Sequence, residues 1–142
     1  MVRVIMHGCN GRMGQVITEM IAKEAEMEIV AGVDVSDSVH NTYPVFKTLK
    51  DCDVEADVVI DFANAKAVDG LLDVCVERNL PCVLCTTGLS EEQLAHVKEA
   101  SGKVAILRSA NMSMGINLLM KLLKDAVPVL AAAGYDMEIV EK

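Results

Sequence analysis

Short apolar runs alternate with longer amphipathic stretches along most of this chain. Runs of this kind, bounded by glycine, proline and acidic residues, are typical of strands that are covered on both faces. We expect strands over residues 2–7, 28–33, 57–61, 81–85 and 103–107. Helical spacing predicts helices over residues 12–25, 65–78, 90–101 and 114–131. The alternation of strands and helices predicts an α/β fold with a Rossmann-type, doubly wound and mostly parallel sheet.

Local signals refine two of these elements. Ser90 and Gln93 have the spacing of a capping box, which places a helix start after Ser90. The stretch 34–56 has the weakest pattern, and we expect a loop with a short strand near Val45 and a short turn of helix.

The last 30 residues have a different pattern. Residues 114–130 are apolar nearly all round, as in a helix buried against more than one partner, with Ser113 as its expected N-cap. Pro128 is expected to kink or end this helix. Residues 136–142 alternate as a strand does, but no further strand follows them. We therefore expect a domain over residues 1–112, followed over 113–142 by only the start of a second, α+β domain.

Composition narrows the class of protein. The chain has 142 residues and a formal net charge of −8, which argues against nucleic acid or an anionic membrane as a partner. No leader pattern and no apolar run of membrane-spanning length is found, so we expect a cytoplasmic protein. Its five cysteines favour a reducing compartment. Cys82 and Cys85 point to opposite faces of a strand, so we expect core packing and no metal site.

A glycine-rich turn between the first strand and the first helix is the most informative motif. Gly8, Gly11 and Gly14 follow the strand, and Asp34 ends the second strand twenty positions after Gly14. This order indicates a dinucleotide-binding unit, in which the turn residues approach a pyrophosphate and the acid meets the adenosine ribose. A purely structural turn and an ordinary exposed acid are the alternatives.

Asp34 also bears on the choice of cofactor. A carboxylate at the ribose repels a 2′-phosphate, so we expect NADH to be favoured over NADPH. Arg12 in the turn, or Lys47, would weaken this preference by supplying a cation.

Three later strand ends are rich in small, hydroxyl or amide residues, and ligands of open α/β sheets lie outside such ends. They are Asp61-Phe62-Ala63, Cys85-Thr86-Thr87-Gly88 and Ser109-Ala110-Asn111-Met112-Ser113. Turns and helix caps are the alternative reading of each, but their convergence on one edge favours a ligand site. The three histidines are scattered (His7, His40 and His96), and no general acid can be proposed from them.

Taken together, these motifs resemble those of the 4-hydroxy-tetrahydrodipicolinate reductase family, also called dihydrodipicolinate reductases. The resemblance covers the whole chain and rests on Gly8-x-x-Gly11-Arg12-Met13-Gly14, Asp61-Phe62, Thr86-Thr87-Gly88 and Asn111-Met112-Ser113-Met114-Gly115-Ile116-Asn117. It implies reduction of a small cyclic substrate by NADH or NADPH in lysine and diaminopimelate biosynthesis, by a homotetramer in the full-length form. It implies cofactor contacts from Gly8, Cys9, Asn10, Gly11, Arg12, Met13, Asp34, Cys85, Thr86, Thr87, Ala110, Asn111 and Met112.

The chain also departs from the family pattern. Cys85 stands where the family has glycine, and Ala63 stands where it has threonine or serine. The resemblance implies that the family's His-His motif, which supplies the proton donor, would lie beyond Lys142, so no catalytic residue is assigned within the chain. We therefore expect the 142-residue chain alone to bind cofactor without turnover.

Other functions remain open at this point. A non-catalytic nucleotide-binding or interaction module is one alternative. Another Rossmann dehydrogenase, or a CoA-binding domain, is the other, although Asp34 argues against CoA.

Overall fold

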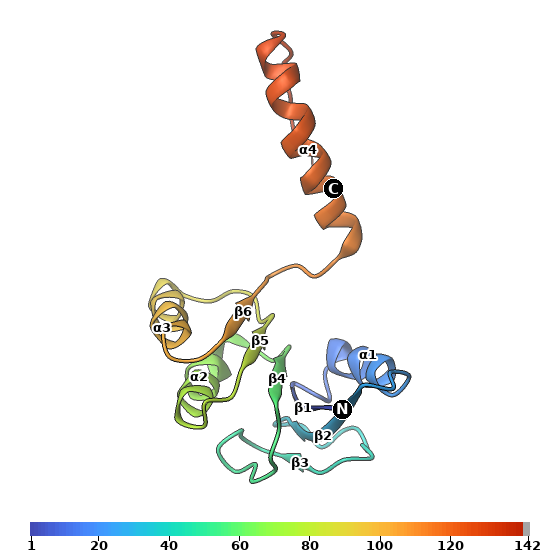
Figure 1. The fold of residues 1–142 in the computed structure, drawn as a ribbon, viewed down its shortest axis with the longest axis vertical. Helices are drawn as coiled ribbons and strands as arrows, with labels where there is room; N and C mark the ends of the chain where they lie inside the picture. Colours follow the sequence, from blue (N-terminus) through green and yellow to red (C-terminus); the bar gives the residue numbers. More distant parts are fainter. Residues whose placement is uncertain (141–142) are drawn as a thin grey trace. The chain divides into compact units, whose positions relative to one another are not determined.

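The computed structural model describes residues 1–140, and its first 110 residues are built on one parallel sheet (Figure 1). The strands run in the order β3-β2-β1-β4-β5-β6, and each neighbouring pair is parallel. Their bounds are Val2–His7 (β1), Met27–Val33 (β2), Val45–Phe46 (β3), Val58–Asp61 (β4), Cys82–Leu84 (β5) and Ile106–Arg108 (β6). This is the strand order of a Rossmann-type fold, and it confirms the predicted fold class.

Helices cover both faces of this sheet (Figure 1). α1 (Arg12–Ile21) packs beside Met6, Cys9 and Tyr43, whereas α2 (Val68–Glu77) and α3 (Glu91–Ser101) enclose the larger core on the other face. Central strand β1 is buried on both faces, because Val4, Ile5 and Met6 are fully inaccessible. The continuous apolar runs of the sequence therefore lie where the pattern placed them.

Several element ends differ from the prediction. α1 ends at Ile21 because the amides of Lys23 and Glu24 bond to carbonyls three residues back, which turns the chain toward β2. β6 begins at Ile106 because the amides of Lys103 and Val104 still bond to Ala100 at the end of α3. The predicted helix 65–78 begins as a short 3₁₀ turn, η1 (Ala65–Ala67), before α2.

Two local predictions hold and one does not. Ser90 and Gln93 form a complete capping box at the start of α3, as their spacing indicated. The short strand near Val45 is β3, which pairs with the end of β2. The expected helical turn in the same region is only a hydrogen-bonded turn, in which Asp51 and Cys52 donate to carbonyls three residues back.

Residues 111–140 form a second compact unit. Its helix α4 (Met114–Ala132) begins at Ser113, whose hydroxyl accepts from the Ile116 amide, as expected for the N-cap. Pro128 lies inside α4 and does not end it, because the loss of one amide donor leaves the remaining turns intact.

The strand predicted over residues 136–142 is wrong for its first five positions. Residues 136–140 pair with no other strand of the described structure. The last two positions of that predicted strand, Glu141 and Lys142, lie outside the described residues.

Two properties of the described residues complete this picture. All five cysteines are free and buried, which confirms the core reading of Cys82 and Cys85. Over residues 1–140, no helix combines the length and the apolar character that a membrane crossing requires.

Candidate functional site

The glycine turn between β1 and α1 brings three backbone segments into very close contact. Gly8 has φ of +81°, and its amide donates to the Val33 carbonyl at 2.8 Å. A Cβ at Gly8 would lie 2.7 Å from the Phe62 carbonyl oxygen, and one at Gly14 would lie 2.2 Å from the Gly8 carbonyl oxygen. Only glycine fits at these two positions, so the start of α1 sits directly against the end of β1.

The first turn of α1 has free donors. Its N-cap, Gly11, has no side chain to accept from the first amides, which have no partner within the helix either. Arg12 and Met13 are exposed at this end. Backbone N–H groups in such a place, reinforced by the helix dipole, are suited to a phosphate group.

Asp34 is held beside this turn at the end of β2. One carboxylate oxygen accepts from the Asn10 amide and the other from the Ser36 amide, both at 2.9 Å. Each oxygen keeps lone pairs for further donors such as ribose hydroxyls. The Lys47 amine lies nearby, but it is paired with Asp37 and also donates to the Val35 carbonyl at 3.1 Å.

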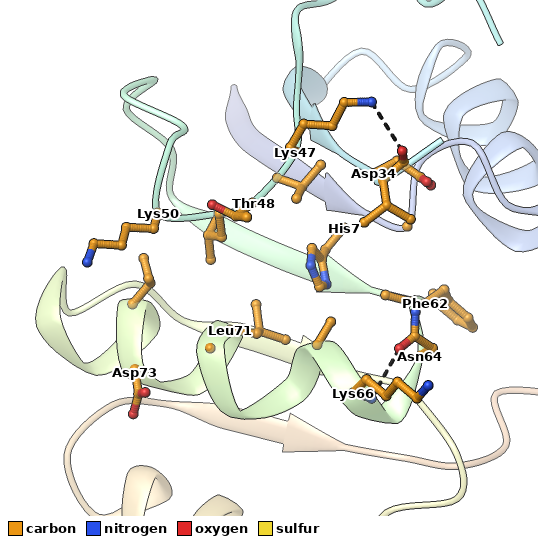
Figure 2. Close-up of a pocket in the computed structure, with 18 of the residues that line it drawn as sticks. His7, Asp34, Lys47, Thr48, Lys50, Phe62, Asn64, Lys66, Leu71 and Asp73 are labelled. Carbon is orange, nitrogen blue, oxygen red and sulfur yellow. Dashed lines mark hydrogen bonds between the residues drawn. The ribbon is translucent and has the colours of Figure 1, made fainter. Parts of the chain in front are cut away.

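A pocket of about 660 Å³ opens between these groups and the start of α2 (Figure 2). Gly8, Gly11 and Asp34 line one side of it, and the η1–α2 segment lines the other. Leu71, almost fully buried, supplies an apolar wall. The pocket therefore combines a glycine turn, a carboxylate and an apolar surface at the point where the strand order reverses, between β1 and β4.

Sequence reasoning missed a buried polar cluster at the base of this pocket. The Nδ1 atom of His7 lies 2.5 Å from Asp61 Oδ1, and the Thr86 hydroxyl donates to Asp61 Oδ2 at 2.6 Å. Asp61 is completely inaccessible, and His7 and Thr86 are 6% and 4% exposed. The alternation shows only that His7 and Asp61 each continue the buried face of a strand, after Ile5 and Val59, whereas their pairing depends on the register of β1 and β4.

The other predicted contacts differ in accessibility. The side chain of Cys9 is buried, and burial raises the pKa of its thiol to about 11. Only the backbone of Cys9 is therefore available to a ligand at the turn. Cys85 is also buried, and burial with the nearby Asp61 carboxylate raises its pKa to about 11. Its amide donates to the Asp61 carbonyl at 3.0 Å, so that donor belongs to the sheet. Thr87 is exposed beside it.

The structure therefore brings together only part of the predicted set. Of the predicted contacts, Gly8, Gly11 and Asp34 line the pocket, Asn10 is hydrogen-bonded to Asp34, and Thr86 is hydrogen-bonded to Asp61 beside His7. Ala110 ends the first unit, while Asn111 and Met112 belong to the second. Among the described residues no cluster of histidine, cysteine or acidic side chains has the arrangement of a metal site.

The proton donor of the reaction was expected beyond Lys142, and that expectation stays a prediction. Lys142 itself lies outside the described residues, so the structure does not test what adjoins it. Within residues 1–140, the polar and charged side chains that line the pocket are those of His7, Asp34, Lys47, Thr48, Lys50, Asn64, Lys66, Asp73 and Glu77.

Comparison with known proteins agrees with the fold and the motifs. A family model described as "Dihydrodipicolinate reductase, N-terminus" matches residues 2–112. The whole chain is 49% identical to a 4-hydroxy-tetrahydrodipicolinate reductase of Caldanaerobacter subterraneus subsp. tengcongensis and 45% identical to one of Clostridium novyi. It covers 55% and 56% of these relatives, so the chain spans about half their length.

Solved structures share the fold of this chain. A dipicolinate-bound dihydrodipicolinate reductase from Paenisporosarcina sp. TG-14 matches with a TM-score of 0.79 and 27% identity, over 89% of this chain and 54% of that chain. A WlbA dehydrogenase from Chromobacterium violaceum, solved with NADH and UDP-GlcNAcA, shares the fold with a TM-score of 0.73 and 18% identity, over 91% of this chain and 40% of that chain. On its sequence, its fold and its glycine turn, the chain belongs to the dihydrodipicolinate reductase family, whose N-terminal part it matches.

Proposed function

We propose that this chain is the cofactor-binding portion of a reductase that reduces 4-hydroxy-tetrahydrodipicolinate with a nicotinamide dinucleotide. The observation that carries the proposal is the pocket in which the glycine turn, the uncapped α1 N-terminus and Asp34 meet at the strand-order reversal. The names of the relatives supply the substrate, and the pocket supplies the cofactor class.

The fit of such a cofactor follows from the backbone. A Cβ would fill the space at Gly8 and Gly14, so these glycines leave the turn open to a close approach by a pyrophosphate. Asp34 would accept hydrogen bonds from the adenosine ribose, while Thr87 and the segment 110–112 would serve the nicotinamide end. When bound, the cofactor supplies a hydride, and the residues of this chain bind and orient it.

We further propose that NADH is preferred over NADPH. Asp34 would place a carboxylate beside the 2′-position of the adenosine ribose, and Lys47, which lines the same pocket, is already paired with Asp37. Lys47 would then do little to offset the repulsion between the carboxylate and a 2′-phosphate, which leaves Arg12 as the other cation to consider.

Titration of the purified chain with NADH and NADPH, followed by ligand fluorescence, tests both proposals. We expect binding of NADH, and weaker binding of NADPH. Asp34→Ser should weaken the binding of NADH and narrow the difference in affinity between NADH and NADPH. The control Asp125→Ser, on α4, should change neither affinity. No measurable binding of either dinucleotide would refute the proposed function, and tighter binding of NADPH would refute the preference.

A turnover assay tests the expected division of labour, in which the proton donor lies beyond Lys142. We therefore expect the 142-residue chain to bind NADH without oxidising it when the cyclic substrate is added. Steady oxidation of NADH that depends on substrate would show that the chain carries its own proton donor.

A further inference from the structure

The imidazole of His7 is the one histidine ring that lines the pocket of the described structure, and its two nitrogens have different surroundings (Figure 2). Nδ1 contacts Asp61. Nε2 makes no hydrogen bond within residues 1–140, and over the same residues no buried polar side-chain atom lacks a partner. Nε2 is consequently reached from the pocket, into which Figure 2 shows the ring pointing.

Asp61 determines which nitrogen carries a proton. An ionised carboxylate can only accept, and this one already receives the Thr86 hydroxyl at 2.6 Å and the Ala63 amide at 3.3 Å. Because the ionised carboxylate has no proton to donate, the hydrogen bond between the two groups requires the proton on His7 Nδ1. A second proton on the ring then has to reside on Nε2, facing the pocket, with its charge balanced by Asp61.

The charges around the pocket indicate what a protonated His7 ring would contribute to ligand binding. The formally charged side chains that line the pocket are Lys47, Lys50, Lys66, Asp34, Asp73 and Glu77. Asp61 lies behind the His7 ring. Their formal charges nearly cancel, so the pocket offers little net attraction to an anion. His7 directly precedes Gly8 and lines the same pocket as Gly8 and Gly11.

We propose that protonated His7 is a contact residue for the diphosphate of the bound dinucleotide, donating from Nε2, and that Asp61 and Thr86 are positioning residues that fix the ring. The inference rests on the proposed function and adds to it a buried side-chain donor beside the backbone amides of the glycine turn. Donation from Nε2 requires a proton on that atom as well as on Nδ1, so binding of the dinucleotide is then coupled to uptake of a proton at His7.

Calorimetric titration of the whole chain tests this coupling directly. NADH is titrated between pH 5.5 and 8.5 in two buffers that differ in ionisation enthalpy, and the difference in heat gives the protons taken up. We expect uptake at neutral pH. His7→Gln should weaken NADH roughly tenfold or more at low pH, as for loss of a charge-assisted hydrogen bond, and remove most of the pH dependence.

Control variants and ligands separate a contact from a structural role. His96→Gln, on α3 and paired with Asp69 and Asp73 outside the pocket, should leave affinity and proton uptake unchanged. ADP-ribose should lose affinity in His7→Gln as NADH does, whereas adenosine, which has no phosphate, should not. Asp61→Asn keeps the shape of the side chain but removes the negative charge that balances protonated His7. The affinity of this variant for NADH should therefore match that of the parent only at lower pH.

If these variants do not fold, a measurement on the unsubstituted chain still tests the inference. Nitrogen NMR of the labelled histidines should show Nδ1 of His7 protonated in the free protein and Nε2 becoming protonated when NADH binds. If the parent binds NADH without proton uptake and the His7 signals do not change, the inference is overturned while the proposed function stands. If the parent does not bind NADH, the proposed function itself fails.

Discussion

Replacement of Gly14 by alanine tests whether the close contact between α1 and the glycine turn holds the site together. The added Cβ would lie 2.2 Å from the Gly8 carbonyl oxygen and 2.7 Å from the Cys9 Cα. Ordinary contact begins at 3.4 Å, so the helix or the turn has to move by about 1.2 Å, and both obstacles are backbone atoms that cannot rotate away.

The energetic balance has two parts. Overpacking of a tight contact costs about 1–3 kcal/mol, and a backbone clash of this size belongs at the upper end. Alanine recovers up to about 1 kcal/mol in a helix relative to glycine. We therefore expect Gly14→Ala to lower the free energy of unfolding by about 2 kcal/mol, which lowers Tm by roughly 8–16 °C for a unit of this size.

Two matched substitutions serve as controls. At Gly70, within α2, a Cβ meets nothing within 4 Å, so Gly70→Ala has only the helix term and should raise Tm by a few degrees. Gly115→Ala, whose Cβ meets only the Ser113 hydroxyl at 3.9 Å, is the control for ligand binding. Calorimetric melts and NADH titrations measure both effects. If Gly14→Ala has the same Tm as Gly70→Ala and the same affinity for NADH as Gly115→Ala, the argument for the close contact is refuted.

Three further predictions concern stability and reactivity. Leu71→Ala, at a pocket wall that is almost fully buried, should lower the free energy of unfolding by about 2–5 kcal/mol in urea titrations; a loss below 1 kcal/mol would contradict its burial. Hydrogen bonds from Arg3 lower the pKa of Asp57 to about 2. The stabilising pair is therefore fully present above about pH 4 and is lost as the pH falls through 2. Asp57→Asn should be less stable than the parent at pH 6, with a difference that approaches zero only below pH 2, and a constant difference would refute this. All five thiols are buried, and burial raises the pKa of Cys9 and Cys85 to about 11. A thiol reagent at pH 8 should therefore modify no cysteine in the native chain and all five in denaturant. Rapid labelling of the native chain would contradict this prediction.

The pattern of the chain predicted most of the fold because its signals are local. β1, β2 and β4 are mostly apolar runs, and the capping box of α3 depends on two residues three positions apart. Element ends were less accurate because hydrogen bonds between successive elements, such as those at the ends of α1 and α3, decide where each one stops. The strand expected over 136–142 failed over residues 136–140, since a strand requires a pairing partner and not only an alternating pattern.

The candidate site divides in the same way. The glycine turn and Asp34 could be predicted because their function depends on backbone conformation and on a fixed spacing along the chain, and both are visible in the sequence. The cluster of His7, Asp61 and Thr86 could not, because its members lie 54 and 25 residues apart and meet only through the register of three strands.

The sequence by itself thus determined the class of fold, the family and the turn that indicates a dinucleotide, since each is a matter of residue type and spacing. Tertiary structure decided which predicted residues are accessible: it buried the thiols of Cys9 and Cys85 and committed the Cys85 amide to the sheet. It also placed a histidine, backed by a buried carboxylate, at the base of the pocket. The physical reason is that burial and pairing depend on which strands lie side by side, and that order is set by packing of the whole sheet.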